Sequence, residues 1–297
     1  ETGGELMEYF LTQVINGLAI GSIYALLSVG YSVIYSILNL INFAHGDLCM
    51  VGVFICMAVI SSTGNVWIAL ITACIFGAVL GLAVEVLAYK PVRTASRAAP
   101  FVSAVGVAMI MRGIAQVIWG SSMQSFPQIM PFGVYKIGNI TISGLAVNIC
   151  VIAAIIMIIV TLFLEKTRMG LSIKCVSSNI QTSHLMGIRV NSIISIVYAF
   201  GAAIGVLGMI FYATYYQSVF ISMGFAATVK AFTAALMGGL GNLYAAFAGG
   251  IILGLIEALG AGFISSGYRD AIAYGVLILV LLIKPTGIFG IKKAEKV

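Results

Sequence analysis

The sequence predicts an all-α fold, a polytopic membrane helical bundle of about eight or nine hydrophobic segments. Hydrophobic residues make up 61% of the 297 residues and charged residues only 8%, whereas soluble domains carry about 25% charged residues. Several apolar runs reach the length of about 20 residues that a helix needs to cross a bilayer. The chain lacks the alternating segments of about 10 residues that are typical of membrane β-barrels.

The apolar runs define the expected helices in chain order. The first run ends where Asn39 begins a polar interruption, and the last ends before a basic tail. The run at 225–240 is too short for a full crossing of about 20 residues, so we expect a re-entrant or broken helix there. The runs lie at 9–37, 47–62, 66–88, 100–119, 143–164, 192–215, 225–240, 244–264 and 271–289.

We expect a single transmembrane domain over residues 7–297. Residues 1–6, with the sequence ETGGEL, read as a remnant of expression, because Met7 opens a natural-looking N-terminus. The interval 120–142 is expected to be the largest external loop, since Pro127 and Pro131 oppose a regular helix. It serves either as a plain connector or as a surface for a ligand-delivering protein.

Glycines recur at the four-residue spacing that lets two helices approach closely in lipid. Gly17 and Gly21 show it in the first run, and Gly250 and Gly254 show it in the eighth. The surrounding segments, GLAIGSIYAL and GIILGLIEAL, also resemble each other, and transporters are often built from repeats. Tight helix packing is the simplest explanation of this spacing.

Basic residues gather in three clusters, which orient the bundle. Because loops rich in Lys and Arg stay in the cytoplasm, we expect all three clusters on that side, the C-terminus in the cytoplasm and the N-terminus outside. The net charge of +6 is then a topology signal and not a footprint for nucleic acid. The clusters are Lys90, Arg93 and Arg97; Lys166, Arg168, Lys174 and Arg189; and Lys284, Lys292, Lys293 and Lys296.

Polar residues within the apolar runs are candidate functional residues, because a charge near the bilayer centre costs about 2.5–3.5 kcal/mol. Short polar residues and a glycine interrupt the chain before residue 48, and backbone groups freed by a helix break must face protein or water. This cluster is either a structural break or part of a translocation path or its gate. Its members are Asn39, Asn42, His45 and Asp47.

Glu257 lies deep in its run and requires a cation, for which Arg112 and Lys230 are the candidates. We expect a buried ion pair that holds two helices together, with either partner. Glu85 lies close to the first basic cluster, which predicts a second pair at the membrane boundary. A proton relay would need a chain of acids, and the nine acids of this sequence argue against an ion-driven carrier.

The interval 165–191 is polar and basic, and we expect it to be a cytoplasmic loop on which another protein docks. The chain has no G-x-x-x-x-G-K-[ST] motif and no soluble domain of ATPase size, so energy from ATP must come from another polypeptide. The five cysteines lack metal-like spacing. With no paired catalytic residues, we expect no enzyme activity, no metal site and no cofactor bound by this chain.

Five motifs, occurring in order from about Met7 to the end, resemble those of LivH-type permeases of branched-chain amino acid ABC importers. The resemblance implies a non-catalytic subunit of a bacterial plasma membrane importer for leucine, isoleucine and valine. It also implies four kinds of partner: the bilayer, a second similar permease, two cytoplasmic ATPases that use ATP and Mg²⁺, and an external amino-acid-binding protein. The motifs are LNLINFAHGDLCMVG, LAYKPVR, TRMGLSIKCVSSNIQTSHLMGI, KAFTAALMGGLGN and LIKPTGIFG.

The resemblance further implies a coupling helix that contacts the ATPases and moves as a rigid lever. The sequence departs from the family pattern at SSNIQ, where many relatives carry an acidic residue and alanines. Related importers for urea, short amides or other amino acids are the alternative, and a channel or ion-coupled carrier is a weaker one. The implied coupling residues are Val176, Ser177, Ser178, Asn179, Ile180, Gln181, Thr182, Ser183, His184, Leu185, Met186, Gly187 and Ile188.

Overall fold

Long helices dominate the computed structural model, which describes residues 2–93, 95, 98–130, 133–137, 140–284 and 286–289. Eight of the described helical segments are long and apolar enough to cross a membrane, and this confirms the predicted polytopic bundle. The N-terminal helices are α1 (Thr2–Leu38), α2 (His45–Thr63), α3 (Val66–Val84), which continues as a π-helical turn (Glu85–Tyr89), and α4 (Ala99–Trp119).

The C-terminal part of the chain adds the remaining crossings and three shorter helices between them. The short α9 has 16 residues, as expected for the run at 225–240. The helices are α5 (Gly144–Lys166), α6 (Arg168–Ser178), α7 (Ile180–Leu185), α8 (Val190–Tyr216), α9 (Met223–Gly238), α10 (Leu243–Phe263) and α11 (Arg269–Ile283), with a 3₁₀ turn (Ser266–Tyr268) before α11.

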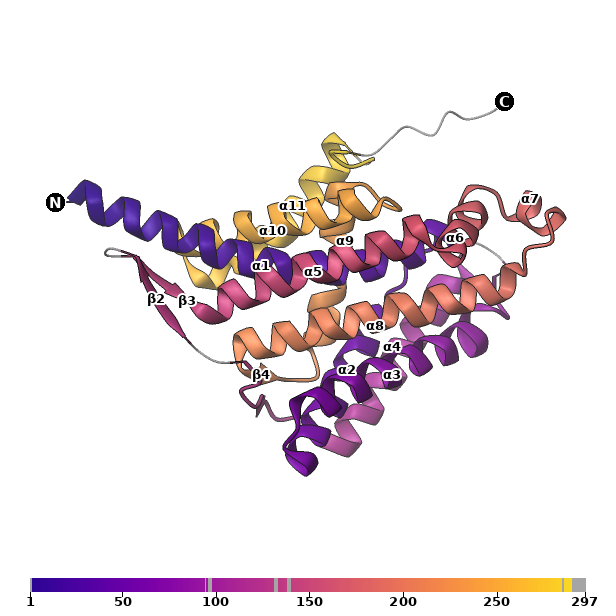
Figure 1. Ribbon diagram of the computed structural model, residues 1–297, viewed down its shortest axis with the longest axis horizontal. Coiled ribbons are helices and arrows are strands. Elements are labelled where there is room, and N and C mark those ends of the chain that lie inside the picture. The colour runs from indigo at the N-terminus through magenta and orange to yellow at the C-terminus, as the bar shows by residue number, and fades with distance from the viewer. Residues whose placement is uncertain are drawn as a thin grey trace.

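Helix α1 forms the centre of the bundle. The most apolar stretch of α1 is 94% buried, whereas that of α11 is only 6% buried and those of α3 and α4 are 22% buried. Helix α1 packs against α10, α8, α9 and α5, and it is one continuous helix of 37 residues whose start projects at one end of the molecule (Figure 1). The outer helices therefore present apolar faces to lipid or to a membrane partner.

Glycines bring α1 and α10 into close contact along an antiparallel crossing. A Cβ atom added to Gly254 would lie 2.2 Å from the Cα of Gly21, and one added to Gly250 would lie 2.4 Å from the Cα of Ala25. Gly21 and Gly254 hold equivalent positions in the two similar segments noted in the sequence. The four-residue spacing thus marks helix packing, because any larger side chain here would separate the two backbones.

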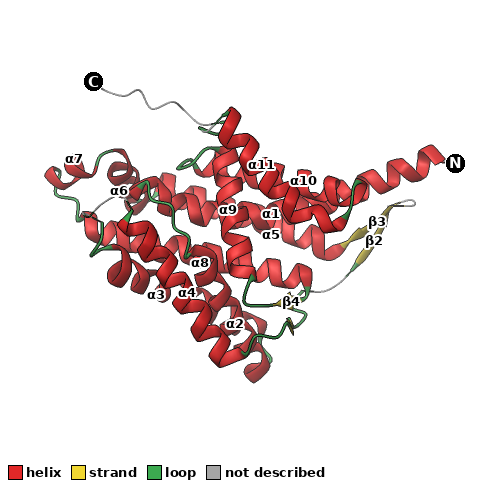
Figure 2. Ribbon diagram, turned by 180° about the vertical axis from the view of Figure 1, so that it is seen from behind, coloured by secondary structure: helices red, strands yellow, loops and turns green. Residues whose placement is uncertain are grey.

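Short strands occupy the end of the bundle where α1 begins. Strands β2 (Val134–Ile137) and β3 (Ile140–Ser143) form an antiparallel hairpin, and β1 (Gln124–Ser125) pairs with β4 (Ser218–Val219). The hairpin lies at the opposite end from α6 and α7 (Figure 2). The interval 120–142, expected to be a loop, thus contains short strands, which its β-branched and aromatic residues favour.

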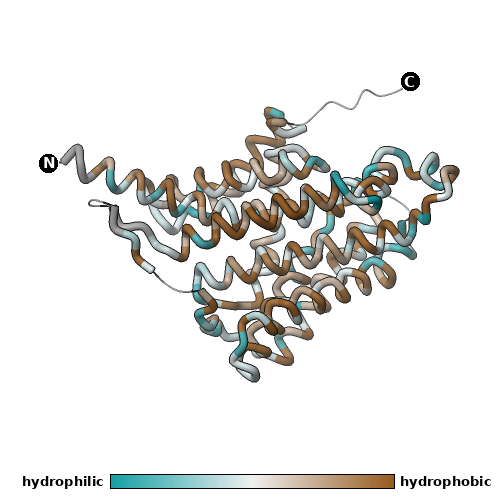
Figure 3. Tube along the Cα trace, viewed as in Figure 1, coloured by the Kyte–Doolittle hydropathy of each residue, from teal (hydrophilic) through white to brown (hydrophobic). Residues whose placement is uncertain are grey.

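The described residues of the first two basic clusters lie on segments at the α6–α7 end, where hydrophilic residues are concentrated (Figure 3). Arg93 pairs with Glu85 at 3.1 Å, as expected, and Glu85 accepts a hydrogen bond from Ser195 near the start of α8. Lys284 donates to the carbonyl of Ile288, and that segment bonds to the end of α9. Arg97, Lys292, Lys293 and Lys296 lie outside the described residues.

Candidate functional site

The segment 176–188, expected to form one coupling helix, is not a single helix: it comprises the last three residues of α6 and the whole of α7. Its coupling role stays a prediction. Helix α6 ends at Ser178 and α7 begins at Ile180, with Asn179 in an extended conformation between them. The Asn179 side chain accepts a hydrogen bond of 2.9 Å from the Thr182 backbone N–H, which caps α7. Asparagine favours this capping position over a helix interior because its side chain competes with backbone hydrogen bonds.

Helix α6 is fixed to the bundle. The Thr167 side chain accepts a 3.0 Å hydrogen bond from the Gly170 N–H and caps the helix. A Cβ atom at Gly170 would lie 2.3 Å from the carbonyl oxygen of Leu164, so the chain turns sharply from α5 into α6. On the inner face of α6, Ile173 and Val176 are buried. This part of the segment therefore belongs to the packed core.

Helix α7 projects from the bundle at the end farthest from the start of α1 (Figure 1). Leu185 is 88% exposed and Met186 is 77% exposed, which places two large apolar side chains on a polar segment. Gly187 follows with a φ of 79°, a left-handed conformation that ends the helix and favours glycine. The exposed residues of this surface, called the α7 surface below, are Ser178, Asn179, Ile180, Gln181, Thr182, His184, Leu185, Met186 and Gly187.

The polar interruption between α1 and α2 forms a buried junction. The Asn42 side chain accepts hydrogen bonds from the Ala44 N–H (3.0 Å) and the Tyr89 hydroxyl (2.9 Å). His45 is 1% exposed and lies edge-on to the Tyr31 ring. Asn39, in contrast, is exposed and ends α1 with a φ of 51°. This geometry favours the structural interpretation, and a gating role of these residues stays a prediction.

Asp47, the fourth member of that cluster, pairs with Arg112. Arg112 Nε lies 2.7 Å from Asp47 Oδ1 and Arg112 Nη2 lies 2.8 Å from Oδ2, a two-pronged contact with a carboxylate that is fully buried. The Arg112 guanidinium also lies over the Phe225 ring, 5.3 Å from its centroid. The contact joins α2, α4 and α9, so Arg112 is engaged away from Glu257.

Glu257 pairs with the other candidate, Lys230. Lys230 Nζ lies 3.1 Å from Glu257 Oε1, and the Tyr24 hydroxyl donates to the same oxygen at 2.9 Å. Lys230 also lies 2.9 Å from Asp270, and Arg269 lies 3.6 Å from Glu257. Two acids and two cations therefore balance within a network that joins α1, α9, α10 and α11.

Sequence reasoning missed Tyr24, Arg269 and Asp270 as members of this network. One signal was present for Tyr24, because it holds the same position in GLAIGSIYAL that Glu257 holds in GIILGLIEAL. A polar residue at matching positions of two similar segments indicates a shared contact. For Arg269 and Asp270 the sequence shows only a charged pair at the start of a span, which is common at membrane boundaries.

Comparisons with known proteins agree with the sequence motifs. BraD of Pseudomonas aeruginosa, a high-affinity branched-chain amino acid transport system permease protein, is 34% identical over 302 residues, which cover 97% of this chain and 98% of that protein. LivH of Escherichia coli, a protein of the same description, is 32% identical over 303 residues with the same coverage.

Two similarities are weaker. The fructose import permease protein FruG of Bifidobacterium longum is 24% identical over 242 residues, which cover 77% of this chain and 68% of that protein. A solved structure of PsaBC from Streptococcus pneumoniae in complex with Fab has a TM-score of 0.48 and 14% identity, with 91% of each chain covered. That structural similarity is too low to support an argument.

The family described as "branched-chain amino acid transport system / permease component" matches residues 13–281. This match and the relatives above 30% identity each extend over nearly the whole chain. The protein is therefore a multi-pass membrane protein that belongs to the family of branched-chain amino acid transport system permease components.

Proposed function

We propose that the chain is one membrane subunit of an ATP-driven bacterial importer that takes up leucine, isoleucine and valine. Its family and its near-full-length similarity to BraD and LivH support this proposal. The working assembly pairs it with a second similar permease, two ATPases that use ATP and Mg²⁺, and an external amino-acid-binding protein. The chain itself performs no catalysis and carries the substrate across.

The positive-inside rule supports an orientation for the assembly in the plasma membrane. The described residues of the first two Lys and Arg clusters of the chain lie at the α6–α7 end, so that end faces the cytoplasm. The start of α1 and the β2–β3 hairpin then lie outside, where a binding protein delivers its ligand. The C-terminus lies on the cytoplasmic side.

The α7 surface is the observation that carries the coupling mechanism. Exposed apolar residues outside the membrane mark a protein contact, and Leu185 and Met186 supply two of them. When ATP binding closes the ATPases, α7 moves with its docking groove, and the displacement passes through Asn179 to α6 and directly to α8. The permease has two conformational states, and the ATPases can shift the equilibrium between them only by the difference in their binding free energy to the α7 surface in each state.

Replacing Leu185 or Met186 by serine tests this mechanism. Each variant should reduce co-purification with the ATPases and leucine uptake into proteoliposomes by about tenfold or more, since each apolar anchor contributes about 1–3 kcal/mol to an interface. Met123→Ser is the matched control for co-purification with the ATPases, because Met123 is 65% exposed but lies in the interval at the other end.

Two results would contradict the proposal. Full uptake and full ATPase retention in both serine variants would exclude α7 as the docking element. Leucine transport by the chain purified alone would exclude an ATP-driven subunit. Competition by unlabelled valine, urea and acetamide in the same uptake assay identifies the substrate class among the related importers.

A further inference from the structure

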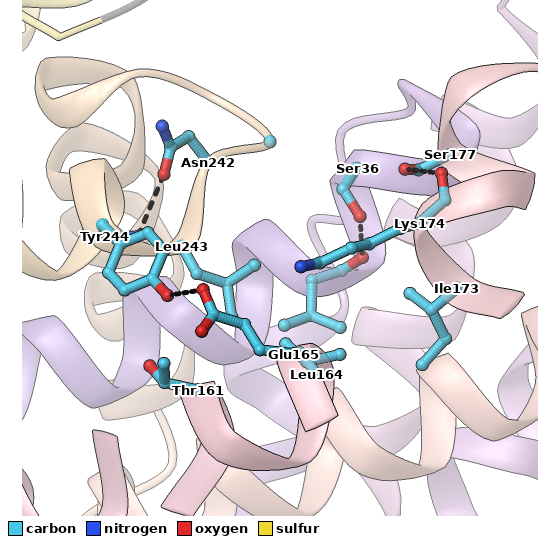
Figure 4. Close-up of a pocket in the computed structure, with 12 residues that line it drawn as sticks. Ser36, Thr161, Leu164, Glu165, Ile173, Lys174, Ser177, Asn242, Leu243 and Tyr244 are labelled. Carbon is cyan, nitrogen blue, oxygen red and sulfur yellow. Dashed lines mark hydrogen bonds between the residues drawn. The ribbon is translucent and has the colours of Figure 1, made fainter. Parts of the chain in front are cut away.

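A pocket of about 290 Å³ lies at the α6–α7 end, beside the coupling segment (Figure 4). Its walls come from the last turns of α1 and α5, from α6, and from the loop and first turn that lead into α10. Cavities of about 300–1,000 Å³ accept drug-sized ligands, so this pocket suits a smaller molecule of metabolite size.

Two opposite charges line the pocket. Glu165, at the end of α5, accepts a hydrogen bond from the Tyr244 hydroxyl through one carboxylate oxygen, and its second oxygen remains available as an acceptor. Lys174 extends from α6 into the space between α6 and the start of α10 (Figure 4). In the part of the chain that the structure describes, none of the ion pairs includes Lys174.

Apolar side chains complete the lining. Val33, Leu164, Ile173 and Leu243 contribute to the walls beside the charged groups. A ligand that satisfies all three features needs an ammonium for Glu165, an anionic oxygen group for Lys174 and an apolar part. A neutral sugar lacks the charges, and a simple ion lacks the apolar part.

We propose that this pocket binds a zwitterionic α-amino acid with an apolar side chain on the cytoplasmic side of the membrane. The carboxylate faces Lys174, the ammonium faces Glu165, and the side chain lies on the wall formed by Val33 and Leu243. The proposal rests on the proposed function and adds a product site to it. Because Lys174 and Ser177 line the pocket from α6, occupancy is linked to the position of the coupling segment.

A membrane lipid offers a similar charge pair. An apolar groove formed by residues such as Met157, Leu162 and Phe247 shares Thr161 and Tyr244 with the pocket. The ethanolamine headgroup of a phospholipid combines an ammonium with an anionic phosphate, and its acyl chain would follow this groove. The experiment must therefore separate a free amino acid from a lipid headgroup.

Saturation-transfer NMR on the permease–ATPase complex makes this separation. The complex is placed in phosphatidylcholine nanodiscs without binding protein, and the methyl signals of millimolar leucine are recorded. We expect saturable transfer that falls at least fivefold in Lys174→Gln and in Glu165→Gln. Lys166→Gln is the matched control, since Lys166 is an exposed lysine of the same region that does not line the pocket.

Ligand analogues test the charge assignment on the unmodified protein, which avoids any folding defect of a variant. Leucinamide lacks the carboxylate and 4-methylpentanoate lacks the ammonium, so both should give at least fivefold weaker transfer than leucine. Residual leucinamide binding should not respond to Lys174→Gln, and residual 4-methylpentanoate binding should not respond to Glu165→Gln.

Three outcomes would overturn the proposal. The first is an absence of saturable leucine transfer, the second is equal transfer in all variants, and the third is loss of the leucine signal when phosphatidylethanolamine replaces phosphatidylcholine. The third would assign the pocket to a lipid headgroup. Leucine uptake by the complex with its binding protein is measured in parallel: normal uptake with any of these outcomes refutes only the pocket, whereas absent uptake refutes the proposed function.

Discussion

The buried pair between Lys230 and Glu257 gives a quantitative prediction about stability. Replacing Lys230 by methionine keeps the apolar stem and removes the ammonium, which leaves the Glu257 carboxylate in a site with no solvent exposure. Breaking a buried ion pair in this way costs about 3–5 kcal/mol. We expect about 3 kcal/mol, because Tyr24 at 2.9 Å and Arg269 at 3.6 Å remain beside the carboxylate.

The reverse change should cost less. In Glu257→Gln, Lys230 keeps Asp270 at 2.9 Å and the Tyr24 hydroxyl at 3.0 Å. Asp270 is an acid, so the ammonium that remains is still neutralised by a carboxylate. The double variant removes both charges, and its cost should be smaller than the sum of the single costs by about 1.5 kcal/mol or more, since residues in contact couple by about 0.5–3 kcal/mol.

Each variant is unfolded in mixed micelles by titration with a denaturing detergent, and its free energy of unfolding is compared with that of the unmodified protein. Lys166→Met is the matched control, and we expect no measurable change, because Lys166 is exposed at the end of α5. If the single costs add to the double cost within about 0.5 kcal/mol, the two side chains are independent and the reasoning from the 3.1 Å contact is refuted.

Two further predictions concern backbone geometry. Gly254→Val should abolish the yield of folded protein in size-exclusion chromatography, because a Cβ atom would lie 2.2 Å from the Cα of Gly21. Gly113→Val is the control and should preserve the yield, because nothing lies within 4 Å of a Cβ atom added there. A normal yield of Gly254→Val would contradict the close crossing. Asn179→Ala should remove the α7 cap at a cost of about 1 kcal/mol and speed hydrogen exchange of the Thr182 amide about fivefold, and unchanged exchange would count against the cap.

The membrane spans are predictable because their length and hydropathy follow from the bilayer itself. Each apolar run of the sequence has its helix in the structure, and the break after Leu38 falls where short polar residues gather. The four-residue glycine spacing identified a real helix crossing. These features are local, so the residues that determine them are neighbours in the chain.

The candidate site was less predictable, because its contacts join distant segments. Arg112 and Lys230 were equally plausible partners for Glu257, and only the packing of α2 against α4 and α9 assigns Arg112 to Asp47. The single helix expected over 176–188 is interrupted at Asn179, which ends α6 with an extended backbone and caps α7 with its side chain. The family motif located the segment, but the capping side chain sets its shape.

The contact between Gly21 and Gly254 has a consequence for how the bundle responds to mutation. Gly21 contacts Gly254 and Tyr24 contacts Glu257, and the two residues of each pair are 233 positions apart in the chain. Corresponding positions of the two similar, antiparallel segments therefore contact each other, which defines a local two-fold axis between α1 and α10. The methyl group of an alanine at either glycine would meet the backbone of the opposite helix at the same point of the α1–α10 contact. Once the first methyl group has moved the helices apart, the second meets a wider gap, and the paired change should be milder than two independent defects.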